Sequence, residues 1–313
     1  MISSRLIICF VPGKRKRADV QEFQLRLTNN ILSLHRDLKN NTYRHGGYEH
    51  FVVTDPKRRD INKASVRDRL VHHAIYRILY PCYDRKFIND SYSCRNNKGT
   101  HRAITKFKKF AGKISQNNTK TCWVLKCDIR KFFASIDQAI LLKILEKNIT
   151  DPATLELLIK VISSFNSGVI GVGLPLGNLT SQLLVNIYMN EFDQFVKHKL
   201  NMKYYIRYAD DFVILNQNRN QLLKTFQLTE RFLEARLKLK FHPKKVSITT
   251  FVSGVDFLGW VHFPHRSVLR AVTRKRVMRR LDNPDISESS RQSYLGLLSK
   301  GDTFDLQNKL QES

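Results

Sequence analysis

The chain of 313 residues lacks the features of a secreted or membrane-spanning protein. No apolar run approaches the length of a spanning helix, and the apolar start, Leu6 to Val11, is too short for a signal sequence. The cysteines form an odd set with no Cys-x-x-Cys pair and no matching histidine spacing, which argues against a disulfide framework and against a zinc site. They are Cys9, Cys82, Cys94, Cys122 and Cys127. We therefore expect a soluble, intracellular protein.

Acidic residues are scarce relative to basic ones. The 54 Lys and Arg residues against 27 Asp and Glu residues give a formal net charge of +27. Solubility alone requires a much smaller net charge. A membrane surface would also attract such a protein, but a nucleic acid is the simplest polyanionic partner.

Hydrophobic periodicity alternates between helix-like and strand-like segments, without internal repeats or low-complexity linkers. A basic run, Lys14 to Arg17, precedes one amphipathic helix through Phe23 and Leu38. A second helix begins near Val66 and is expected to stop at Pro81. Further helices are predicted over 139–147, 155–165, 180–199, 221–237 and the basic tail to 281, and strands over 51–53, 121–128, 204–208, 212–215, 246–250 and 254–261.

Carboxylates stand where predicted strands end. The alternating segment that starts at Thr121 ends at Asp128, and Asp210 and Asp211 lie at the tip of a predicted hairpin. Adjacent carboxylates repel and need a compensating cation, although an ordinary acidic turn is the simpler reading of this pair alone. With Asp128 as a third carboxylate, the set would supply hard oxygen ligands for two Mg²⁺ ions. Such a pair of ions supports nucleotidyl transfer.

A family resemblance rests on ordered segments of the chain. The segments are Trp123–Asp137, Gly173–Tyr188, Arg207–Leu215 and Gly254–Gly259. In this order they resemble the motifs of reverse transcriptases, and the likeness extends from about Lys14 to Arg280. It implies an α+β fold of the right-hand polymerase type, in which fingers, a palm with an antiparallel sheet backed by helices, and a short helical thumb are combined. The implied boundaries are an arm and fingers over 1–120, a palm over 121–262 with a finger-like excursion near 160–180, and a thumb over 263–313.

The resemblance assigns catalytic roles by position. Asp128 and Asp210 are the implied metal ligands, the backbone carbonyl of Ile129 assists them, and Asp211 is a supporting carboxylate. The implied cofactor is a pair of Mg²⁺ ions, with Mn²⁺ as a substitute. Lys245 falls where the family carries a lysine that protonates the leaving pyrophosphate, and plain surface charge is the alternative.

Nucleotide contacts are implied in the same way. Lys57 and Arg59 match the cations that hold the incoming triphosphate. Phe133 occupies the position of a steric gate that would collide with a ribose 2′-hydroxyl, while a core role for Phe132 or Phe133 is the alternative. The template and nucleotide-positioning motif contributes Leu176, Gly177 and Gln182.

The positioning motif departs from that of retroviral and group II intron enzymes. Leu176-Gly177 and Ser181-Gln182 stand where those enzymes carry Gln-Gly and Ser-Pro. This form, with the segment Asp90–Arg102, resembles the enzymes of diversity-generating retroelements, which copy a template RNA and misincorporate opposite adenines. An aliphatic Leu176 removes a polar constraint on nucleotide placement, so looser selection is expected.

The resemblance also implies partners and a location. The partners are a template RNA, the cDNA product, deoxynucleotides and a small, basic, helical accessory protein that forms an oligomer, with no membrane. A cytoplasmic location is expected for a bacterial or phage-encoded enzyme.

Other readings remain open. An antiviral-defence or group II intron-like reverse transcriptase is the first, although a chain that ends at Ser313 leaves no room for the later domains of an intron enzyme. A non-catalytic RNA-binding scaffold is the second. The three intact acids, Asp128, Asp210 and Asp211, count against the scaffold.

Overall fold

The computed structural model describes residues 13–54, 57–281, 287–299 and 301–304. The apolar start, Cys9, and Asp55 and Pro56 of the charged loop lie outside these residues. The chain folds into two compact units that alternate along the sequence. Unit 1 comprises Met1–Ile88, Ile129–Phe195 and Glu230–Lys240, and unit 2 comprises Asn89–Asp128, Val196–Thr229 and Phe241–Ser313.

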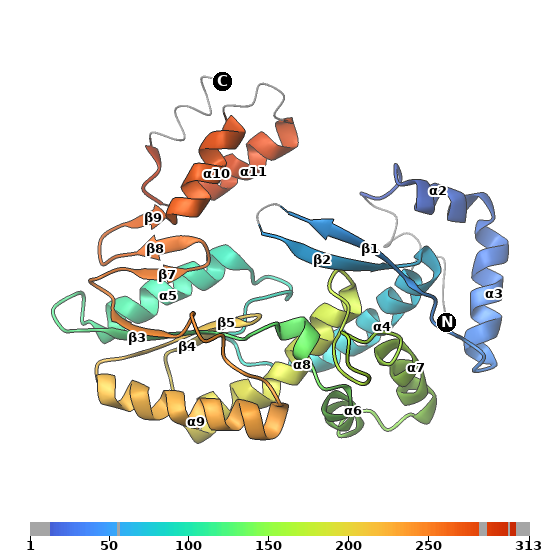
Figure 1. The fold of residues 1–313 in the computed structure, drawn as a ribbon, viewed down its shortest axis with the longest axis horizontal. Helices are drawn as coiled ribbons and strands as arrows, with labels where there is room; N and C mark the ends of the chain where they lie inside the picture. Colours follow the sequence, from blue (N-terminus) through green and yellow to red (C-terminus); the bar gives the residue numbers. More distant parts are fainter. Residues whose placement is uncertain (1–12, 55–56, 282–286, 300, 305–313) are drawn as a thin grey trace. The chain divides into compact units, whose positions relative to one another are not determined.

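Unit 1 combines a β-hairpin with helices (Figure 1). The helix α4 packs against α8, and α6 packs against α7 and α8. A glycine-rich connection, residues 168–177, leads into α8, and its glycines at 168, 171, 173 and 177 have positive φ. The elements are α2 (Ala18–Leu25), α3 (Leu27–Lys39), β1 (Tyr48–Val53), β2 (Arg59–Ala64), α4 (Val66–Asp84), the short 3-10 helix η1 (Phe132–Ser135), α6 (Gln138–Glu146), α7 (Pro152–Ile162) and α8 (Leu179–Gln194).

The predictions for the first helices were wrong in detail. The single helix expected after the basic run is two helices that meet at Arg26, whose φ of −120° and ψ of 36° leave the helical region. No Gly or Pro marks this break, and the apolar spacing continues across it. The helix α4 also runs past Pro81 to Asp84. Proline disrupts a helix through the preceding turn, and here only three residues of α4 follow it.

Asp68 ties the start of α4 to the segment that precedes the hairpin. Its carboxylate is 1% exposed and accepts hydrogen bonds from the Tyr43 hydroxyl at 2.7 Å, the Gly46 amide at 3.1 Å and the Ser65 hydroxyl at 2.6 Å. Ser65 in turn caps the helix by accepting from the Asp68 amide at 3.1 Å. A buried carboxylate that accepts from three donors is satisfied. Its removal would leave all three donors without an acceptor.

We predict that Asp68→Ala lowers the free energy of unfolding by about 2–4 kcal/mol, because the Tyr43 hydroxyl and the Gly46 amide lose their acceptor inside unit 1. Urea titration followed by circular dichroism measures the change. Asp60→Ala is the matched control, since the Asp60 side chain is 62% exposed. Equal effects of the two substitutions would contradict the role given to Asp68.

Unit 2 is built on an antiparallel sheet. The strands β3 (Trp123–Asp128), β4 (Tyr205–Tyr208), β5 (Asp211–Asn216) and β6 (Ser247–Thr250) form it in the order β4-β5-β3-β6. A second antiparallel sheet contains β7 (Val255–Phe257), β8 (Trp260–His262) and β9 (Ser267–Leu269). The remaining elements are α5 (Thr100–Ile114), the π-helix η2 (Phe195–Lys199), α9 (Arg219–Leu237), α10 (Ala271–Leu281) and α11 (Glu288–Leu298), of which η2 and α9 each continue from one unit into the other. The α+β class and the antiparallel sheet are confirmed.

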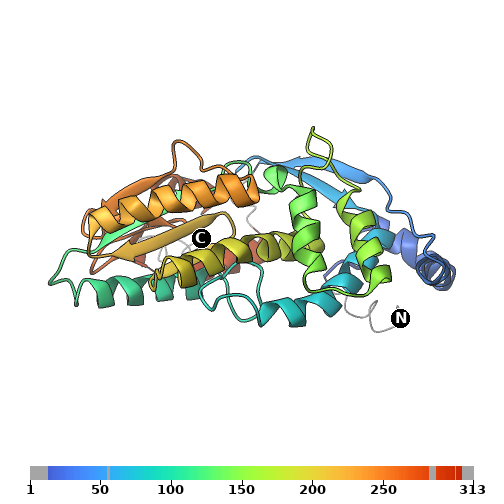
Figure 2. The same cartoon turned by 90° about the horizontal axis from the view of Figure 1, so that it is seen from below.

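Helices cover both faces of the four-stranded sheet (Figures 1 and 2). On one face, Val124 and Val213 pack with Phe107 of α5. On the other, Phe212 meets Phe241, which stacks on Phe226 of α9. Because side chains alternate along a strand, Lys126 and Asp128 project from the same face as Val124.

The single strand predicted over 254–261 was wrong. The structure has a hairpin there, in which Phe257 pairs with Trp260 and the two loop residues, Leu258 and Gly259, have φ values of 53° and 87°. Two positive φ values are typical of a tight hairpin turn that usually carries Asn or Gly first. The leucine in that position conceals the turn from sequence patterns. The basic tail forms α10, as predicted.

Candidate active site

Two acids face each other across neighbouring strands of unit 2. Asp128 ends β3 and is paired in register with Asp211, the first residue of β5. Residues paired in antiparallel strands project to the same face, so the two carboxylates are neighbours. Tyr208 also pairs with Asp211, which makes Ala209 and Asp210 the two-residue turn of the β4–β5 hairpin. The structure thus brings the three predicted acids to one end of the sheet.

A buried arginine fixes this turn. Arg207 is fully buried, and its guanidinium donates to the Ala209 carbonyl at 3.1 Å and to the Ser91 hydroxyl at 3.1 Å. Ala209 has a φ of 55°. This left-handed backbone conformation costs a residue with a side chain about 1–2 kcal/mol relative to glycine. A strained turn held by surrounding bonds is a common feature of functional sites. The position of Asp210 is therefore set by Arg207 and the segment that includes Ser91.

Lys245 neutralises Asp128. Its ammonium donates to both carboxylate oxygens, at 3.0 and 2.9 Å. The backbone brings the lysine there, because the His242 amide donates to the Asp128 carbonyl at 2.8 Å and the Lys245 amide donates to the His242 carbonyl at 3.0 Å. The sequence-predicted lysine thus contacts a predicted metal ligand.

Asp211 carries the unusual electrostatics. Burial raises the pKa of Asp211 to about 7, Lys126 opposes the rise, and the charges of Asp210, Asp128 and Asp256 add to it. Its Oδ1 atom is buried and has no hydrogen-bond partner within the described residues. An acid that holds its proton near neutrality, with an unsatisfied oxygen, marks a place where a cation would stabilise the charged form.

The acids fit a divalent cation chemically. Carboxylate oxygens are the ligands that Mg²⁺ prefers, the Lys245 ammonium already stands on Asp128 as a positive charge, and Asp211 has an unused oxygen. Ile129, whose carbonyl was predicted to assist, directly follows Asp128 and is 1% exposed. Within the part of the chain that the structure describes, no three or more His, Cys, Asp or Glu side chains are already grouped as a metal site. The fit therefore rests on the pairing of Asp128 with Asp211 and on Asp210 in the adjacent turn.

The predicted nucleotide-binding residues lie in unit 1. Lys57 precedes β2 and Arg59 begins it, and both are exposed. The end of the glycine-rich connection lies along the same strand, because the Asn62 amide donates to the Leu176 carbonyl at 3.0 Å. A Cβ on Gly177, whose φ is 110°, would lie 2.7 Å from Ile61. Only glycine permits this approach.

The other residues of the positioning motif are partly accessible. Leu176 is half-buried, and Gln182 lies half-buried in the first turn of α8.

The two phenylalanines of η1 have different environments. Phe132 is 4% exposed and belongs to the core, whereas Phe133 is half-buried. The Phe133 carbonyl accepts from the Leu174 amide at 2.8 Å, which joins η1 to the glycine-rich connection. The core alternative is therefore confirmed for Phe132, and Phe133 remains the candidate gate.

The residues that hold these segments of unit 1 were not predicted. The Asn178 side chain accepts from the Ala64 amide at 3.2 Å and donates to the Asn62 carbonyl at 2.7 Å, so it continues the backbone pairing of β2. Asp137 caps α6 and pairs with Lys238 at 2.6 Å. The position of Asp137 just before a helix could have indicated the cap, but the contacts of Asn178 and Lys238 need the fold.

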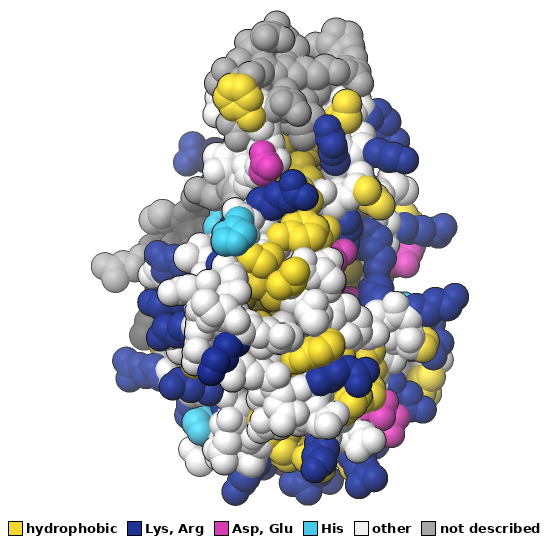
Figure 3. Space-filling view, turned by 90° about the vertical axis from the view of Figure 1, so that its left-hand side faces the viewer, with side chains coloured by type: hydrophobic (Ala, Val, Ile, Leu, Met, Phe, Trp, Pro, Cys, Tyr) yellow, Lys and Arg dark blue, Asp and Glu magenta, His cyan; other side chains and the backbone are white. Residues whose placement is uncertain are grey.

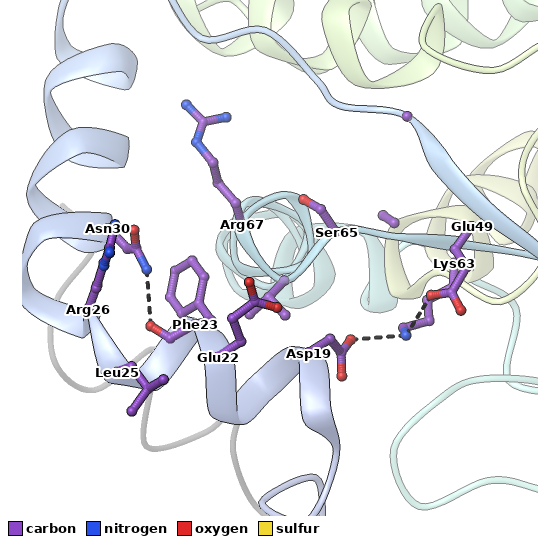
Figure 4. A pocket seen from close by; sticks show the side chains of 13 residues that line it. Asp19, Glu22, Phe23, Leu25, Arg26, Asn30, Glu49, Lys63, Ser65 and Arg67 are labelled. Atoms are coloured by element: carbon purple, nitrogen blue, oxygen red, sulfur yellow. Dashed lines mark hydrogen bonds and ion pairs between the residues drawn. The ribbon is translucent and has the colours of Figure 1, made fainter.

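A separate cavity of about 750 Å³ lies in unit 1 between α2, the hairpin and the start of α4 (Figure 4). Lys63 bridges Asp19 at 3.0 Å and Glu49 at 2.8 Å on its wall. The hydrogen bonds that the Lys63 ammonium donates to Glu49 and Asp19 raise the pKa of Lys63. None of the sequence-predicted site residues lines this cavity.

The fold and the acids together define the class of right-hand polymerases. The structure is similar to telomerase from Candida albicans in a complex with a fragment of telomeric RNA, with a TM-score of 0.54, 12% identity, and coverage of 82% of this chain and 53% of that one. The telomerase of Candida tropicalis gives a TM-score of 0.53 at 12% identity, over 77% of this chain and 60% of that one. The likeness concerns the fold.

The family model for reverse transcriptase (RNA-dependent DNA polymerase) matches residues 44–262, and the chain belongs to this family. Protein YkfC of Escherichia coli (strain K12) is 28% identical over 243 residues, or 65% of this chain and 62% of YkfC. The group II intron-encoded protein LtrA of Lactococcus lactis subsp. cremoris is 24% identical over 202 residues, or 62% of this chain and 33% of LtrA. The match thus spans less than two thirds of either relative. Reverse transcriptases in general depend on divalent metal ions.

No helix among the described residues is both long enough and apolar enough to cross a membrane.

We predict that Asp211→Asn stabilises the metal-free protein at pH 8 and not at pH 4. The unfolded carboxyl loses its proton near its usual pKa of 3.8 and the folded one near 7, so the wild type loses stability as the pH rises through this window. The gain is on the order of 2–4 kcal/mol at pH 8. Thermal unfolding in EDTA at several pH values measures it, with the exposed Asp60→Asn as control. A stability difference between Asp211→Asn and the wild type that does not change with pH would contradict the raised pKa of Asp211.

Proposed function

We propose that this protein is an RNA-directed DNA polymerase that copies a template RNA into cDNA by two-metal nucleotidyl transfer. The observation that carries the proposal is the pairing of Asp128 with Asp211 beside the Asp210 turn, in a chain of the reverse transcriptase family. Asp128 and Asp210, helped by the Ile129 carbonyl, would hold the ions, and Asp211 would support them. Two bound Mg²⁺ ions, or Mn²⁺ in their place, would activate the primer 3′-hydroxyl and stabilise the leaving pyrophosphate.

Lys245 has a further task in this proposal. Its ammonium holds Asp128 at 2.9 Å in the protein alone, so the site carries less repulsion between its acids. A cation bound to Asp128 would take the place of the ammonium. Lys245 would then be free to donate a proton from Nζ to an oxygen of the departing pyrophosphate.

Nucleotide selection is proposed for the residues of unit 1. Lys57 supplies a point charge and Arg59 a planar fork, which suit the oxygens of a triphosphate. The half-buried Phe133 ring excludes a ribose 2′-hydroxyl and so favours deoxynucleotides. Gly177 and Gln182 position the template and the nucleotide, and the close approach of Gly177 to Ile61 supports a fixed backbone there.

We predict that Asp128→Asn and Asp210→Asn each reduce primer extension on an RNA template by on the order of a thousandfold, because each removes a charged ligand of the ions. Incorporation of deoxynucleotides with Mg²⁺ measures the rate. Glu146→Gln, an exposed acid at the end of α6, is the control and retains full activity. Activity in the two Asp variants equal to that of the control would leave an RNA-binding scaffold as the function.

The finer proposal is a diversity-generating retroelement enzyme that makes errors at template adenines and works with a basic, helical, oligomeric accessory protein. It is supported by Leu176, which is half-buried and whose backbone carbonyl accepts from the Asn62 amide of β2. An aliphatic side chain offers no hydrogen bond to constrain the nucleotide.

We predict that Leu176→Gln lowers the error frequency opposite template adenines by about tenfold, the effect of one net hydrogen bond of about 1–1.5 kcal/mol. Sequencing of cDNA products measures it. Leu223→Gln, at a leucine of α9 that is 38% exposed, is the matched control. An unchanged error spectrum in Leu176→Gln would show that Leu176 does not cause the errors at template adenines.

A group II intron-like reverse transcriptase, or one used in antiviral defence, is the second candidate. The similarity to LtrA, an intron-encoded protein, favours the intron-like form. The same sequencing experiment separates the candidates, because accurate copying across adenines by the wild type supports this second reading.

A further inference from the structure

A basic surface on unit 2 lies far from the three acids. The helix α5 buries one face against the sheets, and Lys108, Lys109 and Lys113 stand exposed on the other. Residues 99–120 contain no Asp or Glu. Among the residues that the structure describes, these three lysines form no ion pair. Ammonium groups that lie close together on a helix without acidic partners repel one another. A bound polyanion would offset this repulsion.

A small cavity of about 270 Å³ adjoins this row of lysines. It is lined by Lys108, Asn117, Asn118, Phe263, His265 and Arg266, among others. Phe263 and Arg266 belong to the loop between β8 and β9, where the Phe263 amide donates to the Arg266 carbonyl at 2.9 Å. The exposed asparagines follow α5 in three successive residues with positive φ, Gln116 to Asn118. Figure 3 views unit 2 from the end at which α5 finishes, and shows Lys and Arg side chains on either side of a strip of apolar ones.

The Phe263 ring is held in place. A Cβ on Gly254, whose φ is 90°, would lie 2.6 Å from the ring, so the ring rests directly on that backbone. The Arg266 guanidinium lies 5.4 Å from the ring centroid. Aromatic and guanidinium planes of this kind stack on unpaired bases, and asparagine amides bond to base edges. The cavity is just below the size of pockets for drug-like ligands, about 300–1,000 Å³, and suits one nucleobase.

The surface is distinct from the acids because it meets the opposite end of β3. The Phe251 amide, in the wall of the cavity, donates to the carbonyl of Cys122, which directly precedes β3, whereas Asp128 ends this strand. Six residues of extended chain span roughly 20 Å. A nucleotide bound here is not the one at the reacting centre.

We propose that this surface binds an unpaired segment of RNA outside the copied stretch. The phosphates lie along Lys108, Lys109 and Lys113, and one base enters the cavity to stack on Phe263. The proposal goes beyond polymerisation and rests on the proposed function only in taking RNA as the template. We call the surface formed by Lys108, Lys109, Lys113, Asn117, Asn118, Phe263 and Arg266 the α5 patch.

The test compares two triple variants with the same change in charge. Lys108, Lys109 and Lys113 are replaced by Gln in one, and Lys199, Lys203 and Lys224, exposed elsewhere on unit 2, are replaced by Gln in the control. The probe is a fluorescent poly(U) RNA of about 20 nucleotides, longer than most single-strand binding sites. The dissociation constant is measured over a series of salt concentrations.

The α5 patch variant is expected to weaken binding and to reduce the slope of log affinity against log salt by about 2, the value for three phosphate contacts on a single strand. The control triple changes the slope by less than half as much. Equal slopes for the two triple variants overturn the proposal. The α5 patch would then bind a partner other than RNA. Extension of a primer whose template carries only a short 5′ overhang to be copied, with no further unpaired RNA, stays at the wild-type rate in the patch variant, so a failure of the polymerase proposal would be seen separately.

Phe263→Leu tests the base contact and is expected to weaken poly(U) binding about tenfold, as stacking on an aromatic ring does. An abasic RNA of the same length should bind the wild type and Phe263→Leu equally, because no base enters the cavity. A tenfold loss on the abasic strand as well would overturn the stacking role. Arg266→Gln repeats the comparison if Phe263→Leu lowers the melting temperature.

Discussion

The candidate site depends on the pairing of β3 with β5, which sets two carboxylates side by side in a protein of net charge +27. Like charges on opposed residues of a sheet are destabilising, and here the fold compensates only in part. Lys245 neutralises the charge of Asp128. Burial raises the pKa of Asp211, so that this acid keeps its proton up to a pH near 7. Arg207, the Ala209 turn and the segment around Ser91 keep the hairpin in place despite this repulsion.

The same balance explains why the surrounding charge is positive. A basic surface would attract the phosphates of the proposed template and primer, and the three acids lie where the proposed cations would bind. Elsewhere several acids are already paired with bases, as Asp19 is with Lys63 and Asp137 with Lys238. Asp211 differs from both because its Oδ1 has no hydrogen-bond partner within the described residues.

Much of the fold and the acids could be predicted from the sequence. The alternation that ends at Asp128 and the apolar runs around Ala209 and Asp210 reflect burial, which leaves a local pattern in the chain. The turn at Leu258 and Gly259 was missed because a leucine stands at its first position, where Asn or Gly is usual, and the break at Arg26 was missed because no Gly or Pro marks it. The bonds from Asn178 to β2 and from Lys238 to Asp137 join residues about one hundred positions apart, and no local pattern encodes them.

The order of the strands also shapes how the protein forms. β3 is a central strand, yet both of its neighbours come later in the chain, and Asp211 follows Asp128 by 83 positions (211 − 128). On the ribosome, β3 therefore emerges long before it can pair. Sheets that depend on such distant contacts fold slowly, and an unpaired apolar strand is prone to wrong association in the meantime. The acids assemble only at a late stage, so a nascent chain in which β3 has emerged and β5 has not contains Asp128 without its partner Asp211.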